Sequence, residues 1–180
     1  RDESRIGALR AAGIPPVVAE LLAGRGVSDP AVARHFLQPK LTDLRTPDLL
    51  PDCARAAERI YEALRAGRPI TIYGDYDVDG MTGTAILLQC IKLLGGKASY
   101  YIPSRLEEGY GLHDEAVRRI AADGASLIVT VDCGIASVGP AQTARECGVE
   151  LIVTDHHEPG AELPFATAIV HPRLPGRDYP

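Results

Sequence analysis

Residues 126–157 read SLIVTVDCGIASVGPAQTARECGVELIVTDHH. Two continuous apolar runs, residues 127–131 and 151–153, flank a stretch whose composition is typical of a helix. Apolar runs without alternation are typical of strands that are buried on both faces of a parallel sheet. The stretch therefore predicts a strand, a crossover helix and a second parallel strand, and the two strands end at Asp132 and Asp155.

The same alternation of strands and helices continues on both sides of this unit. Short β-rich runs lie at residues 69–74, 97–103 and 165–172, and helical patterns lie at residues 52–67, 82–96 and 113–124. Asp52 is expected to cap the first of these helices and Gly67 to end it. The sequence thus predicts an α/β fold with a doubly wound, mostly parallel sheet and flanking helices.

Residues 1–50 have a different pattern. Short apolar segments at residues 17–22 and 31–37 are separated by glycines and a proline, and a proline-spaced run follows them. This predicts a lead-in of two or three short helices and an extended strap, with no apparent chemistry. We therefore expect two parts, residues 1–50 and residues 51–180.

Composition excludes several classes of protein. The 180 residues are 46% hydrophobic and 24% charged, as in soluble globular proteins, and no run approaches a membrane span or a signal peptide. Four cysteines without CxxC spacing predict reduced thiols and a cytoplasmic protein. A net charge of −5 argues against a protein that coats nucleic acid, but it is compatible with carboxylates gathered around cations.

Acidic residues follow three of the expected strands. Asp75, Asp77 and Asp79 come after the first strand, Asp132 after the third, and Asp155 with two histidines after the fourth. An acid at one strand end is often a helix N-cap. Because the carboxyl ends of parallel strands meet at one edge, acids at three ends predict a ligand site there.

The segment DYDVDG, residues 75–80, also resembles the start of an EF-hand loop. That loop needs a glutamate at its twelfth position, which here is Ile86 inside an expected helix, so the EF-hand interpretation fails. Gly80 and Thr82 instead place small residues at a helix N-terminus, which favours phosphate binding. This is not a Walker loop, because the Lys-Ser/Thr step is missing.

The ligand types indicate which metal would bind. Carboxylates with one imidazole, from His156, suit Mn²⁺, and Mg²⁺ less well. Cys133 lies next to Asp132, but its side chain is expected to point the other way, so structural zinc is not favoured.

Three segments, YGDYDVDG, VDCGI and TDHH, resemble the first three motifs of the DHH phosphoesterase family. RLEEGYGL at residues 105–112 and the lead-in PPVVAELLAGRGVSDPAVARHFLQP resemble the RecJ-type exonucleases within it, and the likeness runs from about residue 10 to the end. This resemblance implies two cations, Mn²⁺ or Mg²⁺, bridged by a catalytic Asp132. It also implies that Asp77 binds the first, that Asp79 and His156 bind the second, and that His157 contacts phosphate as a catalytic residue.

The chain departs from the family pattern in two respects. Many members have His at the position of Tyr73, so Asp75 is expected to join the ligands of the first cation. The resemblance also implies a further aspartate motif and a second domain downstream. Residues 51–180 are therefore expected to be a DHH domain that is incomplete at its C-terminus, weak or inactive by itself.

Other residues receive lesser expectations. The resemblance places Arg105 and Tyr110 near the scissile strand, where Arg would bind phosphate and Tyr would stack on a base, although Arg105 is equally suited to a salt bridge with Glu107 or Glu108. Cys90, Tyr100 and Tyr101 are expected in the core. Three histidines receive no role: His35, His113 and His171.

The resemblance implies a 5′→3′ exonuclease that acts on single-stranded DNA in repair and recombination, with repair or replication proteins as partners. Two alternatives remain: an oligoribonuclease or nucleotide phosphatase of the same family, and a non-catalytic scaffold. The carboxylate cluster disfavours the scaffold, since grouped buried charges are costly without a function.

Overall fold

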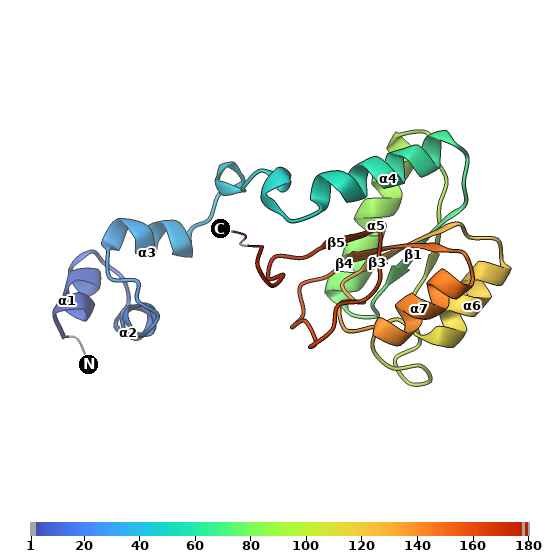
Figure 1. Cartoon of the computed structure of the whole chain (residues 1–180). Coiled ribbons are helices and arrows are strands. Elements are labelled where there is room, and N and C mark those ends of the chain that lie inside the picture. The colour runs from blue at the N-terminus through green and yellow to red at the C-terminus, as the bar shows by residue number, and fades with distance from the viewer. Residues whose placement is uncertain (1–2, 178, 180) are drawn as a thin grey trace. The chain divides into compact units, whose positions relative to one another are not determined.

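The computed structural model describes residues 3–177 and 179. It divides into two units, one ending at Arg45 and the other beginning at Thr46, and Figure 1 draws the elements of both. The first unit contains α1 (Glu3–Ala11), α2 (Pro16–Gly24), α3 (Pro30–Leu37) and the 3₁₀ turn η1 (Leu41–Asp43). Its own small core is formed by Ile6, Leu9, Ile14, Ala19, Leu22 and Ala33.

The second unit is an α/β sheet domain. Its elements are η2 (Pro47–Leu49), α4 (Cys53–Arg65), β1 (Ile70–Gly74), α5 (Val78–Leu93), β2 (Ser99–Tyr101), α6 (Asp114–Ala122), β3 (Leu127–Val131), α7 (Val138–Glu146), β4 (Glu150–Thr154) and β5 (Ala168–Val170). The five strands are parallel, in the order β2-β1-β3-β4-β5. The predicted doubly wound α/β fold is confirmed.

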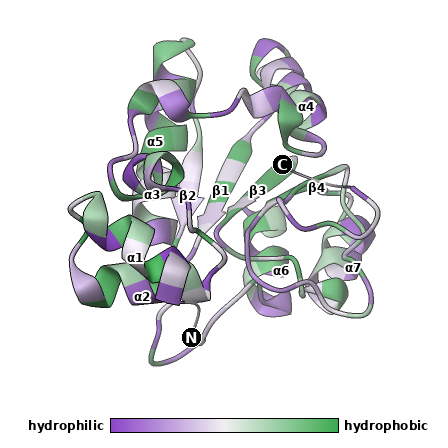
Figure 2. Ribbon diagram, turned by 90° about the vertical axis from the view of Figure 1, so that its left-hand side faces the viewer, coloured by the Kyte–Doolittle hydropathy of each residue, from purple (hydrophilic) through white to green (hydrophobic). Residues whose placement is uncertain are grey.

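Alternate residues of the strands face two different cores. Ile128 and Val153 pack in the core that α6 and α7 cover, whereas Val129 and Ile152 pack in the core that α4 covers. Figure 2 shows the corresponding layers, with α4 and α5 on one side of the sheet and α6 and α7 on the other. Burial on both faces explains why these strands have no polar alternation in the sequence.

The helix α4 begins and ends for reasons that the sequence only partly indicated. Gly67 follows its end with φ +64, as expected of a C-terminal stop. Asp52 precedes it in a left-handed conformation but makes no capping hydrogen bond. Its carboxylate instead accepts from the N–H of Ile169 at 3.2 Å and pairs with Arg177 at 2.7 Å. Asp52 therefore occupies the expected N-cap position of α4, but its side chain ties β5 to the start of the helix instead of accepting a capping hydrogen bond.

Two residues expected in the core are exposed. Cys90 lies on the outer side of α5, and Tyr100 on the edge strand β2 is 64% exposed. Tyr100 belongs to an edge strand that has no neighbouring strand on its outer side within the described part of the domain. Tyr101 is partly buried against the core, as expected. No helix in the described residues is both long and apolar enough to cross a membrane.

Candidate metal centre

The carboxyl ends of β1, β3 and β4 bring acidic and imidazole groups together. Metal-binding atoms lie within 4.8 Å of one another in two groups of described residues. These groups are Asp75, Asp77 and Asp132, and Asp132, His156 and His157. Asp132 therefore belongs to both groups, at the place where the family resemblance implied a bridging carboxylate.

Asp79 lies in neither group. It lines a hollow of about 440 Å³ together with Asp132, Asp155 and His156, and the rest of that wall is largely apolar, with Leu50, Val170 and Pro172. The structure thus brings Asp79 to the same hollow as Asp132 and His156, although its carboxylate is not in contact range of both.

Several oxygens in this cluster have no protein partner. Oδ1 of Asp75 and both carboxylate oxygens of Asp132 are buried and accept no hydrogen bond from the described residues. Nε2 of His156 lies 2.9 Å from Oδ1 of Asp132 but is not aligned as a hydrogen bond. Adjacent ligands of an octahedral ion with bonds of about 2.1 Å are about 3 Å apart. The donor set therefore fits a hard divalent cation.

The carboxylates also influence each other's charge. Burial, and then the neighbouring charge of Asp77, raises the pKa of Asp132. The pKa of Asp77 is lowered, first by the hydrogen bond from the N–H of Gly80, which is 3.0 Å long. Even with His156 and His157 nearby, carboxylates at this range ionise together only at a cost, which a bound cation would remove.

Asp132 has an unusual backbone. Its φ is +64, the left-handed region, and its N–H donates to the carbonyl of Thr154 at 3.0 Å. Asp and Asn adopt this region more readily than other non-glycine residues, and such conformations concentrate at functional sites.

Asp155 positions the histidines rather than offering a ligand. Its buried carboxylate accepts from the N–H groups of Ile135, His156 and His157 at 2.9, 2.7 and 3.1 Å, and from Nδ1 of His157 at 2.8 Å. Burial alone would raise the pKa of Asp155, but these hydrogen bonds lower it on balance. Burial alone would lower the pKa of His157, but the hydrogen bond to Asp155 and the nearby carboxylates raise it on balance, which favours a ring that also carries a proton on Nε2. The sequence indicated the acid but not this role.

Tyr73 does not face the metal cluster. It is fully buried, its hydroxyl donates to the carbonyl of Gly111 at 3.0 Å, and its ring stacks on Tyr101. Asp75 stands among the candidate ligands instead, where the sequence placed it. Cys133 also points away, with its thiol 3.8 Å from the carbonyl oxygen of Tyr73, and burial raises the pKa of that thiol.

The segment that carries Arg105 and Tyr110 reaches the cluster through its tyrosine. The Tyr110 hydroxyl lies 2.8 Å from Nδ1 of His157, and the rings are 5.1 Å apart. The Arg105 guanidinium lies 5.3 Å from the ring centre of Tyr76. Arg105 forms no ion pair within the described chain, and Glu108 accepts hydrogen bonds from Tyr101 and from the N–H of Ser104. The salt-bridge alternative for Arg105 is therefore not observed.

Gly80 and Thr82 serve the local structure. A Cβ at Gly80 would lie 2.5 Å from the backbone of Asp75, and the N–H of Gly80 caps the helix through Asp77. The hydroxyl of Thr82 donates to the carbonyl of Val78 at 2.6 Å. Their contact with phosphate remains a prediction. The N–H of Gly80 and the hydroxyl of Thr82 already have hydrogen-bond partners within the protein.

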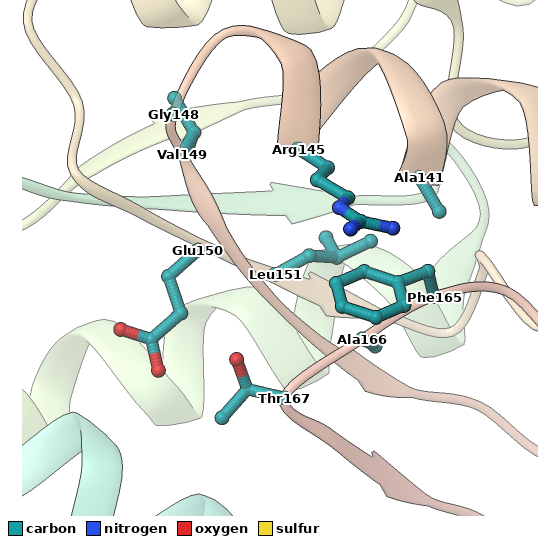
Figure 3. Close-up of a pocket in the computed structure, with 9 residues that line it drawn as sticks. All are labelled: Ala141, Arg145, Gly148, Val149, Glu150, Leu151, Phe165, Ala166 and Thr167. Carbon is teal, nitrogen blue, oxygen red and sulfur yellow. The ribbon is translucent and has the colours of Figure 1, made fainter.

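A second hollow, of about 230 Å³, lies between α7 and residues 165–167 (Figure 3). The Arg145 guanidinium covers the ring of Phe165 at 4.5 Å, and the floor is apolar. Its one carboxylate, Glu150, is paired with Arg59 at 2.8 Å. This hollow lacks a group of convergent ligands, so the strand edge is the better candidate site.

Comparisons with known proteins show which family this chain resembles. The family model "DHH family, N-terminal domain" matches residues 69–178. The chain is 47% identical over 93% of its length to the single-stranded-DNA-specific exonuclease RecJ of Bacillus subtilis, and 40% identical over 94% to that of Escherichia coli. It spans 21% and 29% of those proteins.

Solved structures show the same similarity. An exonuclease RecJ bound to manganese matches 71% of this chain, and 32% of its own, with 46% identity and a TM-score of 0.66. RecJ of Thermus thermophilus in complex with Mn²⁺ matches 94% of this chain, and 23% of its own, with 35% identity and a TM-score of 0.65. With a matching family model over more than half of its residues, and with the acids and histidines of that family gathered at one sheet edge, the chain belongs to the DHH family.

Proposed function

We propose that the strand edge binds two divalent cations, Mn²⁺ or Mg²⁺. Asp75, Asp77 and Asp132 would hold the first, and Asp132, Asp79 and His156 the second. The observation that carries this proposal is the set of buried oxygens of Asp75 and Asp132 that accept no hydrogen bond within the described chain. Buried carboxylates are costly unless they are paired or coordinate metal.

The intact protein would then hydrolyse phosphodiester bonds in single-stranded DNA in the 5′→3′ direction. Similarity to RecJ exonucleases over almost the whole chain supports this substrate. Two cations held here would lower the pKa of a water molecule and polarise the phosphate. The protein's own part would be to fix the ligands and to present Nε2–H of His157 to a phosphate oxygen, with the ring held by the contact between Asp155 and Nδ1.

Arg105 and Tyr110 would hold the DNA strand. Both side chains are exposed, and Arg105 is free of carboxylate partners within the described residues, so its guanidinium can bind phosphate as a planar fork. Tyr110 already contacts His157 and would offer its ring to a base next to the cleaved bond.

Calorimetric titration with Mn²⁺ tests the metal site, with Asp132→Asn as the matched variant. The wild-type chain is expected to bind the ion, and the variant to bind far more weakly, because the shared carboxylate loses its charge. Equal binding by both proteins would contradict the ligand assignment. The nuclease proposal requires the intact protein to digest single-stranded DNA with Mn²⁺ while leaving duplex DNA nearly unchanged.

Repair and recombination are the cellular processes that this activity would serve, in the cytoplasm and with repair or replication proteins as partners. The alternative substrates are separated by competition. Short RNA oligonucleotides or mononucleotides that are hydrolysed faster than single-stranded DNA would favour the oligoribonuclease or phosphatase alternative.

A further inference from the structure

A third histidine, His171, contacts the backbone of His157, the second of the two histidines that follow β4. His171, just beyond the end of β5, is fully buried. One ring nitrogen, Nε2, lies 2.7 Å from the carbonyl oxygen of His157, and the other, Nδ1, accepts from the N–H of Arg173 at 3.0 Å. Because a carbonyl only accepts, the ring must carry its proton on Nε2. Both polar atoms of this buried side chain are thus used in holding backbone.

Arg173 holds the neighbouring peptide. Its guanidinium donates to the carbonyl of His156 at 2.9 Å and pairs with Glu158 at 3.1 Å. The N–H groups of His156 and His157 are held from the other side by the carboxylate of Asp155. The backbone of the two histidines is therefore fixed at its N–H groups by Asp155, which follows β4, and at its carbonyls by the segment after β5.

We propose that His171 and Arg173 are positioning residues for the metal centre, an inference that rests on the proposed metal binding. They set the backbone from which His156 projects its ring to within 2.9 Å of Asp132. Residues that orient ligands without touching the ion commonly change metal affinity by about 10–100-fold when they are lost. An apolar side chain would fill the same space at His171 but would leave the His157 carbonyl unpaired.

Four substitutions test this role by Mn²⁺ calorimetry on the whole chain. His171→Leu removes both hydrogen bonds, and we expect an affinity at least about 10-fold lower. His171→Asn keeps a carbonyl oxygen that can accept from the N–H of Arg173 and an amide group that can donate to the carbonyl of His157. This variant should therefore retain most of the Mn²⁺ affinity. Arg173→Ala leaves the His156 carbonyl without this donor, and we expect a smaller loss of Mn²⁺ affinity than in His171→Leu. The matched control is Glu158→Gln, which removes only the ion pair of Arg173 and should leave the Mn²⁺ affinity unchanged.

Thermal unfolding in the presence of a chelator separates positioning from folding. Arg173 is 60% exposed at its side chain, so Arg173→Ala should unfold at the wild-type temperature and still bind Mn²⁺ less well. In the intact protein, at a temperature where the metal-free variant is fully folded, excess Mn²⁺ should restore the nuclease rate of Arg173→Ala.

The outcomes distinguish this inference from the proposed function. If the wild-type chain bound no Mn²⁺, the metal site itself would be wrong and the positioning role with it. If wild type bound Mn²⁺ and both His171→Leu and Arg173→Ala bound it equally well, the metal site would stand and the positioning role would be overturned. The positioning role of Arg173 would also be overturned if Arg173→Ala and Glu158→Gln lost equal Mn²⁺ affinity. The contact of Arg173 with the His156 carbonyl would then not matter.

Discussion

At the scale of single residues, Gly80 is required by its surroundings rather than by chemistry. The first turn of α5 lies so close to the loop after β1 that a Cβ at Gly80 would meet the Asp75 backbone at 2.5 Å. Gly80→Ala should lower the free energy of unfolding by about 1–3 kcal/mol, measured in urea, because the backbone must move. The substitution should also weaken Mn²⁺ binding, because Asp75 and Asp77 would move with the displaced backbone.

Gly139→Ala is the control for that prediction. This exposed glycine lies in the first turn of α7, and a Cβ there would meet no atom within 4 Å. Its substitution should leave stability unchanged or raise it by up to about 1 kcal/mol. If both variants behaved alike, close packing at Gly80 would not be the reason for its presence.

The two adjacent histidines should differ in function. His156→Ala removes a candidate ligand of the second cation, so Mn²⁺ affinity should fall and added Mn²⁺ should restore part of the rate. His157→Ala should leave Mn²⁺ affinity near normal and reduce the rate without rescue, because Asp155 already holds its Nδ1. Calorimetry and single-strand cleavage by the intact protein measure both. If His157→Ala lost as much Mn²⁺ affinity as His156→Ala, His157 would be a ligand. The distance of 3.9 Å between its Nδ1 and Oδ1 of Asp132 also permits this.

At the scale of elements, an ion pair joins α4 to the first residue of β4. Glu150 accepts from Arg59 at 2.8 and 2.9 Å, and this contact is the main reason that its pKa is lowered. A lowered pKa stabilises the fold above the unfolded value, here 4.5, and the contribution is lost as the pH falls through the folded value. Glu150→Gln should therefore cost about 1 kcal/mol at pH 7 and progressively less in acid, measured by urea unfolding at each pH.

The matched control is Glu62→Gln. Glu62 pairs with the same Arg59 but within α4 and with a half-exposed side chain. Its loss should cost no more than about 0.5 kcal/mol at any pH. A pH-independent difference between wild type and Glu150→Gln would rule out the charged pair as its cause.

Elements were predictable where the local pattern and the fold agree. The runs that became β3 and β4 are apolar throughout because both of their faces are covered. The start of α5 was expected at residue 82 but lies at Val78, because Asp77 caps the helix through Gly80 and so brings the acids into its first turn. Tyr100 was misplaced because only the strand order shows that β2 lies at an edge of the sheet. Cys90 was misplaced because the apolar pattern of α5 did not indicate which of its sides is exposed.

The candidate site was predictable in its acids but not in its supports. Asp75, Asp77 and Asp132 meet because parallel strands end together. The contact of Asp155 with the N–H of Ile135, and that of His171 with the His157 carbonyl, join residues whose partners are set by loop geometry. A loop has no hydrophobic period from which such contacts could be inferred.

At the scale of the whole molecule, the metal centre should couple cation binding to stability. The buried carboxylates of Asp75 and Asp132 lack compensation from hydrogen bonds in the described chain. Mn²⁺ at about 100 times its Kd should stabilise the protein by about 2.7 kcal/mol, and a chelator should reverse this. Scanning calorimetry at several Mn²⁺ concentrations measures the rise in Tm.

Asp132→Asn supplies the comparison for this coupling. It removes one charge from the cluster and keeps a residue that tolerates φ +64. Its Tm without metal should equal or exceed that of wild type, because less repulsion remains, yet its Tm should hardly respond to Mn²⁺. A full Mn²⁺ response in Asp132→Asn would show that the ion binds elsewhere.

The strand order also has a consequence in time. β1 pairs with β3, so Ile70 must meet Leu127, and β3 pairs in turn with β4. Pairings between such distant segments form slowly, since a long loop must close before any contact rewards it. During synthesis, Asp75 and Asp77 leave the ribosome well before Asp132 and His156, the other proposed ligands, exist. A newly made chain therefore carries acids that cannot yet capture a cation, and metal loading becomes one of the last events of its folding.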